Sequence, residues 1–167
     1  MLLGACGDSS SPAANSDGDT SSPAPGDTST DDQGGALPDV CTLLTPDEIN
    51  AQFQYPVDAG VASSPGGPIC NWNTIDFHPE FSGVQLTVME LDQEYFDFVE
   101  GNVANRIDVP GLGDAAFWEA PQNPFVLDVA KGNVHFILYV VAAGAPFTPE
   151  AAQLLIINLA NNVIARL

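Results

Sequence analysis

The chain has 167 residues, of which 22 are Asp or Glu and three are Lys or Arg, giving a formal net charge of −19 at pH 7. This excess of acids repels phosphate, and three cations cannot form the basic patches that nucleic-acid binding needs. The same deficit excludes electrostatic attraction to anionic lipid headgroups. No apolar run reaches the ~18 to 20 residues of a membrane-spanning helix. The nearest one, Phe147 to Leu167, is interrupted by polar residues from Glu150 to Arg166.

The first 36 residues differ in composition from the rest of the chain. Cys6 follows Leu3-Gly4-Ala5, and residues 7–36 contain no aromatic residue and no Leu, Ile, Val or Met. A segment of this kind cannot bury enough apolar surface to offset the entropy of ordering. We therefore expect residues 7–36 to be a disordered linker rich in Ser, Asp, Pro and Gly, with a reach on the order of 30 Å.

The sequence Leu-Gly-Ala-Cys resembles the lipobox of bacterial lipoproteins. In that family the cysteine sulfur receives diacylglycerol, the chain is cleaved just before it, and acyl chains such as palmitate hold the protein to the cell membrane. The resemblance implies lipidation of Cys6 and an extracytoplasmic location. Residues 1–6 are then the remnant of a signal peptide, with Met1 an internal start in a longer one. The alternative is a cytosolic protein in which the four residues occur by chance.

Of the three cysteines, Cys6 belongs to the lipobox-like motif, and the other two lie in the rest of the chain. If Cys6 carries lipid, Cys41 and Cys70 remain as a pair, which favours a disulfide in an exported protein. It would close a loop of about 30 residues and stabilise the fold by roughly 3 to 4 kcal/mol on the chain-entropy model. The alternative is two reduced, buried cysteines.

Residues 37–167 have the length of a single domain. Thr45-Pro46-Asp47-Glu48 has the residues of a capping box, with proline at the first helical position, and predicts a short helix to about Phe53. A loop rich in Pro and Gly then leads to Cys70-Asn71-Trp72, for which we expect a strand.

A second strand and a second helix follow. The segment Val84 to Glu90 alternates between apolar and polar residues, which predicts a strand whose inward residues are Val84, Leu86 and Val88. Three apolar residues then recur at helical spacing and predict a helix that stops near Gly101: Tyr95, Phe98 and Val99.

The last part of the chain predicts a strand, a hairpin and a helix. Residues Ala115 to Glu119 favour a strand. The runs Phe125 to Ala130 and Val134 to Val141 flank a primed turn at Gly132-Asn133. That register pairs Val129 with Phe136, Leu127 with Leu138 and Phe125 with Val140.

Thr148-Pro149-Glu150 caps a C-terminal helix whose apolar stripe is Ala152, Leu155, Ile156, Leu159, Val163 and Leu167. This order of elements predicts an α+β domain with an antiparallel sheet flanked by helices.

Four ordered motifs carry a resemblance to a known family. They are Cys41 to Thr45, Cys70 to Trp72, Val109 to Phe117 and Thr148 to Leu167. Together they resemble actinobacterial cell-envelope lipoproteins that carry a domain of unknown function. The resemblance implies a disulfide-tied α/β/α sandwich similar to the extrinsic oxygen-evolving subunit of photosystem II. The family has no established catalytic residues.

Candidate chemistry is sparse. In the hairpin register, His135 and Asp128 share a sheet face as diagonal neighbours and could orient a general base. No nucleophile motif accompanies them, and the alternative is a polar pair on the helix-covered or solvent side of the sheet. Gly111-Leu112-Gly113 is followed by Asp114, which repels anions, so we expect a turn and not a phosphate loop. The linker acids lack the spacing of a calcium loop.

Four aromatic residues are the candidate lining of a ligand cleft between sheet and helix: Trp72, Phe117, Trp118 and Tyr139. The alternative is that they are plain core.

We expect a non-catalytic binding or accessory module of the bacterial cell envelope, monomeric and without cofactor or metal. Its partner is an envelope protein or an apolar ligand. Carriage of a lipid or small apolar ligand in an interior cavity is the alternative, and hydrolase activity the least favoured one.

Overall fold

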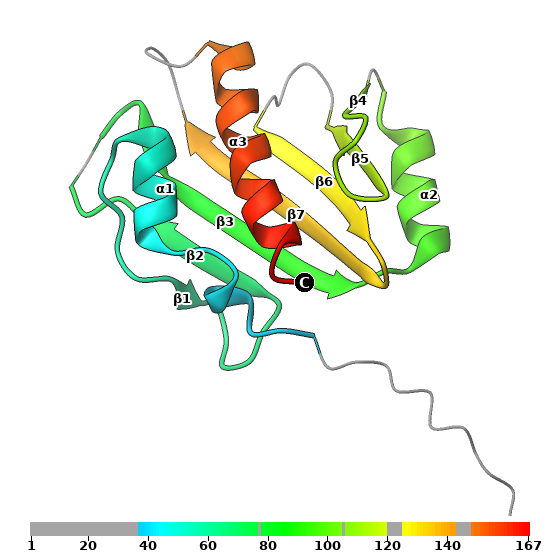
Figure 1. Ribbon diagram of the computed structural model, residues 1–167, viewed down its shortest axis with the longest axis horizontal. Coiled ribbons are helices and arrows are strands. Elements are labelled where there is room, and N and C mark those ends of the chain that lie inside the picture. Colours follow the sequence, from blue (N-terminus) through cyan, green and yellow to red (C-terminus); the bar gives the residue numbers. More distant parts are fainter. Residues whose placement is uncertain (1–36, 77, 105, 120–124, 143–147) are drawn as a thin grey trace, which may run out of the picture. The chain divides into compact units, whose positions relative to one another are not determined.

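The structure is a computed structural model (Figure 1). It describes residues 37–76, 78–104, 106–119, 125–142 and 148–167. Cys6 and the expected linker, residues 7–36, lie outside the described residues. The elements in chain order are η1 (Val40–Thr42), α1 (Pro46–Phe53), β1 (Val61–Ala62), β2 (Ile69–Asn73), β3 (Phe81–Glu90), α2 (Gln93–Asn102), β4 (Ile107–Asp108), β5 (Ala115–Trp118), β6 (Val126–Lys131), β7 (Val134–Ala142) and α3 (Pro149–Ile164).

The described strands form one seven-stranded antiparallel sheet in the order β1-β2-β3-β7-β6-β5-β4. The hairpin β6–β7 has the predicted register, since Val129 pairs with Phe136 and Leu127 with Leu138. The amide of Val140 donates to the carbonyl of Phe125, as that register requires. Gly132 has φ 59°, in the left-handed region that the primed turn needs. The longest pairing joins β3 to β7 at the centre of the sheet.

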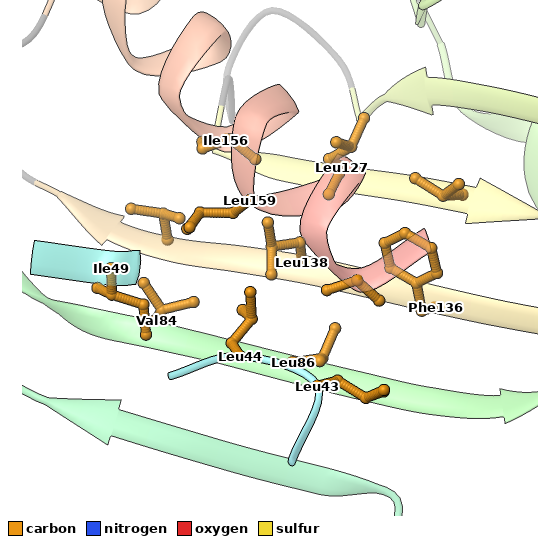
Figure 2. Packing of buried hydrophobic residues seen from close by; sticks show 14 of the residues in the cluster. Leu43, Leu44, Ile49, Val84, Leu86, Leu127, Phe136, Leu138, Ile156 and Leu159 are labelled. Atoms are coloured by element: carbon orange, nitrogen blue, oxygen red, sulfur yellow. The ribbon is translucent and has the colours of Figure 1, made fainter. Parts of the chain in front are cut away.

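The main core lies between the first face of the sheet and the helices α1 and α3 (Figures 1 and 2). The inward residues of β3 are the predicted ones, and each is paired to an inward residue of β7. Side chains from both helices close over them. The labelled members of this cluster in Figure 2 are Leu43, Leu44, Ile49, Val84, Leu86, Leu127, Phe136, Leu138, Ile156 and Leu159, all nearly inaccessible to solvent. Burial on this scale is the main source of stability of the domain.

Both predicted caps are present. Thr45 caps α1 in a full capping box with Glu48, and the helix ends at Phe53 as expected. Thr148 caps α3 by accepting from the amide of Ala151. The predicted stripe of α3 is buried at Ala152, Ile156, Leu159 and Val163, and Ala160 joins it. The prediction for Leu167, the last residue of the stripe, was wrong: its side chain is 40% exposed, because α3 ends at Ile164.

The second face of the sheet carries a smaller cluster under α2. The helix itself and its end are confirmed, but the side chain that α2 buries is Phe96, at 1% exposure. Two of the three residues that predicted the helix, Tyr95 and Phe98, are 51% and 63% exposed. Phe96 packs with Phe117 and Ala130 of the sheet. The α+β class with helices flanking an antiparallel sheet is therefore confirmed, with α1 and α3 on one face and α2 on the other. In the described ranges, no helix is both long and apolar enough to cross a membrane.

Candidate functional site

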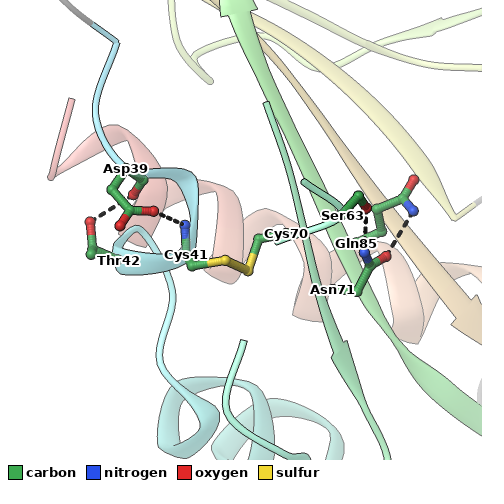
Figure 3. Close-up of a disulfide and its surroundings, with 7 residues drawn as sticks. All are labelled: Asp39, Cys41, Thr42, Ser63, Cys70, Asn71 and Gln85. Carbon is green, nitrogen blue, oxygen red and sulfur yellow. Dashed lines mark hydrogen bonds between the residues drawn. A yellow bond between two sulfur atoms is a disulfide. The ribbon is translucent and has the colours of Figure 1, made fainter. Parts of the chain in front are cut away.

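Cys41 and Cys70 form a disulfide that ties η1 to β2 (Figure 3). The two Cα atoms are 5.3 Å apart and 29 positions apart in the sequence. The carboxylate of Asp39 prepares this junction, because its Oδ1 accepts from the amide of Cys41 at 3.0 Å. The pairing expected from cysteine parity is thus present, and it holds η1 against strand β2.

His135 and Asp128 are brought together on the second face, as the register predicted. His135 Nε2 lies 3.1 Å from Asp128 Oδ1, and both side chains are almost fully buried. The ring of Phe96 meets the His135 ring edge to face at 5.1 Å. The pair is therefore on the helix-covered side of the sheet, enclosed by α2.

The surroundings of Asp128 are poorly satisfied. Its second oxygen, Oδ2, is buried and has no hydrogen-bond partner among the described residues. The charge of Asp128 also acts on Glu119. Burial raises the pKa of the Glu119 carboxyl group, and the charge of Asp128 raises that pKa further. A general base must reach the proton that it removes. The covering of His135 by Phe96 leaves no such approach among the described residues.

The four aromatic residues expected to line one cleft do not share a site. Trp72 and Trp118 belong to the main core on the first face, whereas Phe117 lies in the cluster under α2. All three are buried. Tyr139 is half-buried on the second face, opposite Gln85 and Val126. The plain-core alternative holds for the first three, and only Tyr139 remains available to a ligand.

The segment from Gly111 to Asp114 is a turn, as predicted. Gly111 and Gly113 have φ values of 84° and 62°, and a Cβ on Gly113 would lie 2.5 Å from the carbonyl oxygen of Ala130. Asp114 accepts from the amide of Gly132 and from the ammonium of Lys131. These contacts, the amide first, hold the pKa of Asp114 below its ordinary value. The carboxylate therefore fastens this turn to the β6–β7 hairpin.

A row of polar side chains crosses the part of the second face that α2 leaves open. Asn71 of β2 pairs with Gln85 of β3, which pairs with Tyr139 of β7. Gln85 Nε2 donates to Asn71 Oδ1 at 2.9 Å, and Asn71 Nδ2 donates to Ser63 Oγ at 3.0 Å (Figure 3). We call Ser63, Asn71, Gln85 and Tyr139 the polar row. None of them belongs to either hydrophobic cluster of the described chain.

Three members of the polar row, Ser63, Asn71 and Gln85, are not among the candidate site residues predicted from the sequence, although a signal was present. Asn71 lies between Cys70 and Trp72, and Gln85 lies between the inward residues of β3. Because successive side chains of a strand point to opposite faces, Asn71 and Gln85 must both lie on the face opposite the main core. Their proximity needed the pairing of β2 with β3, which no local pattern shows.

Two hollows in the described surface bear on a binding role, and a third, of about 210 Å³, lies beside the turn at Gly111. A cavity of about 460 Å³ lies beside η1, between Leu37, Val40, Pro68 and Val88. A shallower one of about 100 Å³ lies on the polar row, beside Tyr139. Within the described residues, no group of three or more His, Cys, Asp or Glu side chains is arranged to hold a metal ion.

These features define a small α+β domain with one disulfide and an open, polar half of its sheet. The chain belongs to the family described as protein of unknown function (DUF3558), whose model matches residues 1–111. The matched part runs through η1, α1, the disulfide and the polar strands β2 and β3. No curated protein matches the chain, and no solved structure does.

Proposed function

We propose that this protein is a lipid-anchored, extracytoplasmic binding or accessory module of the bacterial cell envelope and that it is not an enzyme. One observation carries the binding role: strands β2, β3 and β7 present Asn71, Gln85 and Tyr139 of the polar row on a sheet face where no described helix covers them. A sheet in a small domain usually buries at least one face and leaves the other to solvent or to a partner. Here the open half carries neutral hydrogen-bonding groups.

Two features support the location. Leu3-Gly4-Ala5-Cys6 resembles a lipobox, and the domain contains the disulfide Cys41–Cys70. Disulfides persist in oxidising compartments and are rare in the cytosol. The resemblance to actinobacterial envelope lipoproteins, with a fold like the extrinsic subunit of photosystem II, points the same way. On this proposal diacylglycerol on Cys6 holds the protein at the membrane, and residues 7–36 are the linker.

The buried pair supports a structural role over a catalytic one. His135 is 1% exposed, and its side chain contacts Asp128 and the ring of Phe96. Nucleophilic hydrolysis needs a nucleophile within hydrogen-bond reach of the base. The described contacts of His135 include no hydroxyl or thiol group, so hydrolase activity is the least supported reading.

The location is tested in the native host, with the protein expressed from its own gene. We expect it to partition into detergent, and mass spectrometry of the N-terminal peptide to find diacylglycerol on Cys6. Cys6→Ser should release the protein or leave it unprocessed. Ser9→Ala, three positions away, is the matched control and should leave the anchor intact. Recovery of unmodified Cys6 from soluble cytosol would overturn the proposal.

A second candidate function is carriage of a small apolar ligand in the cavity beside η1. Its volume of about 460 Å³ falls in the range of ligand pockets, and Leu37, Val40 and Val88 give it apolar walls. Native mass spectrometry of the protein purified from its own envelope tests this candidate. A retained lipid that is lost in Leu37→Trp, which narrows the cavity, would favour carriage.

A further inference from the structure

We propose that the polar row is a binding site for a neutral oligosaccharide, contacted by Asn71, Gln85 and Tyr139. This inference rests on the proposed role as a binding module and adds the class of ligand. It does not depend on the lipid anchor.

The geometry of the row suits an extended ligand. Its three principal side chains stand on adjacent strands at paired positions, Asn71 with Gln85 and Gln85 with Tyr139. Neighbouring strands lie about 4.8 Å apart, so the row spans about 10 Å from β2 to β7. Ser63 lengthens it beyond β2, through its hydrogen bond with Asn71. A strip of this length presents groups to more than one sugar ring.

The hydrogen-bonding capacity of the row matches hydroxyl groups. A primary amide has one acceptor oxygen and two donor hydrogens. Gln85 donates one hydrogen to Asn71. In the part of the chain that the structure describes, its Oε1 and its other amide hydrogen have no protein partner. The bonds from Gln85 to Asn71 and from Asn71 to Ser63 hold both amides in fixed orientations. Fixed donors and acceptors side by side are complementary to vicinal hydroxyls, each of which donates and accepts.

Tyr139 supplies the apolar half of the site. It is half-buried, and it lines the same shallow hollow as Asn71 and Gln85. The face of an aromatic ring carries negative potential and attracts C–H groups that bear partial positive charge. One side of a pyranose ring is lined by such C–H groups. The ring and the amides together therefore match a ligand that is apolar on its face and polar around its rim.

Charge and shape decide between ligand classes. The hollow is lined by neutral side chains only, including Asn73, Ser82 and Val141, in a chain of net charge −19. An anionic ligand is repelled by such a protein, and a cationic one finds no carboxylate in the hollow. A volume of about 100 Å³ is too small to enclose a drug-sized molecule. These facts favour surface contact with a neutral, extended ligand.

The test uses the full chain on an array of neutral and acidic oligosaccharides, followed by calorimetric titration with the neutral glycan that binds best. We expect Gln85→Ala and Tyr139→Ala each to weaken binding at least about tenfold, since each removes a direct contact. Tyr139→Phe keeps the ring and should bind within a few-fold of the wild type. Asn161→Ala removes an exposed amide on α3, in the opposite layer, and should leave binding unchanged. Thermal unfolding confirms that each variant is folded.

The outcomes separate the two proposals. Absence of any neutral glycan from the bound set, preference for acidic glycans, or equal binding by Gln85→Ala and Tyr139→Ala would overturn the saccharide site. In any of these cases a protein with lipid on Cys6 still fits the envelope module. Neutral-glycan binding that Gln85→Ala abolishes, in a protein found unmodified in the cytosol, would support the site and overturn the proposed location.

Discussion

His135 Nε2 and Asp128 Oδ1 lie 3.1 Å apart beneath Phe96, with side chains that are 2% and 1% exposed. The two residues are diagonal neighbours on β7 and β6, so the hairpin itself sets their distance. Each of them satisfies the polar group of the other in a place that water does not reach. Such a pair adds little net stability, but removing one partner leaves the other buried and unpaired.

The first prediction follows from this mutual dependence. His135→Ala leaves the carboxylate of Asp128 without the partner of Oδ1, while Oδ2 already has none among the residues that the structure describes. We expect a loss of about 3 to 5 kcal/mol in the free energy of unfolding at neutral pH. The double variant His135→Phe with Asp128→Leu replaces both polar groups by apolar ones and should lose less than His135→Ala alone. Urea unfolding of both variants measures this. A loss below about 1 kcal/mol in His135→Ala would contradict it.

What the sequence could predict depended on how local the determinants were. The capping box of α1 lies within four residues, and the register of β6–β7 follows from a two-residue turn, so both were correct. The burial of Phe96, by contrast, depends on where α2 docks, and β5 and β6, which receive it, come later in the chain. The helical spacing of apolar residues predicted that α2 is a helix, but it did not predict which face of the helix is buried.

The expected aromatic cleft shows a different kind of error. Phe117 and Trp118 are consecutive residues of β5. Neighbours in a strand point to opposite faces, so the two could never line one cleft, and the sequence already contained that objection. The polar row is the converse case. Alternation placed Asn71 and Gln85 outward, but only the long-range pairing of β2 with β3 brought them together.

The second prediction concerns Glu48 and Arg166, which join the first turn of α1 to the C-terminal end of the chain. The two guanidinium nitrogens of Arg166 donate to the Glu48 carboxylate at 3.0 and 2.7 Å. Arg166, through its hydrogen bond, is the main cause that holds the pKa of Glu48 below its ordinary value of 4.5. A lowered folded-state pKa gives stability that is present above pH 4.5 and is lost as the pH falls through the folded value.

Glu48→Gln should therefore lower the free energy of unfolding by about 1 kcal/mol at pH 7, the scale of a partly exposed ion pair with a capping contact. At pH 3 the difference from the wild type should shrink. Asp47→Asn, one position earlier, lacks the contact with Arg166 and is the matched control. Denaturant unfolding at both pH values decides the matter. A difference for Glu48→Gln that is the same at pH 7 and pH 3 would contradict the assignment.

The third prediction concerns the disulfide. Cys41→Ser with Cys70→Ser should lower the free energy of unfolding by about 3 kcal/mol, because the unfolded chain regains the freedom of a loop with a sequence separation of 29. Mass mapping without reductant should recover the two cysteines in one linked peptide pair. Cys6→Ser, outside the domain, should leave the free energy of unfolding unchanged. Free alkylation of both Cys41 and Cys70 in the native protein would rule out the bond.

The fourth prediction compares two phenylalanines of the same helix. Phe96 is 1% exposed and lies 5.5 Å from the ring of Phe117, whereas Phe98 is 63% exposed. Phe96→Ala should lower the free energy of unfolding by about 3 to 5 kcal/mol, since it opens a cavity in the smaller cluster. Phe98→Ala should change it by no more than about 0.5 kcal/mol. Urea unfolding measures both, and equal losses would show that α2 docks through a different face.

Phe96→Ala also tests what encloses the buried pair. Removal of this ring opens a path to His135, which the ring covers edge to face in the wild type. Water that enters there can hydrate the unpartnered Oδ2 of Asp128. The His135→Ala change should then cost less in a Phe96→Ala background than in the wild type, because the exposed carboxylate no longer needs its partner. Additive losses in the double variant would show that Phe96 does not keep water from the pair.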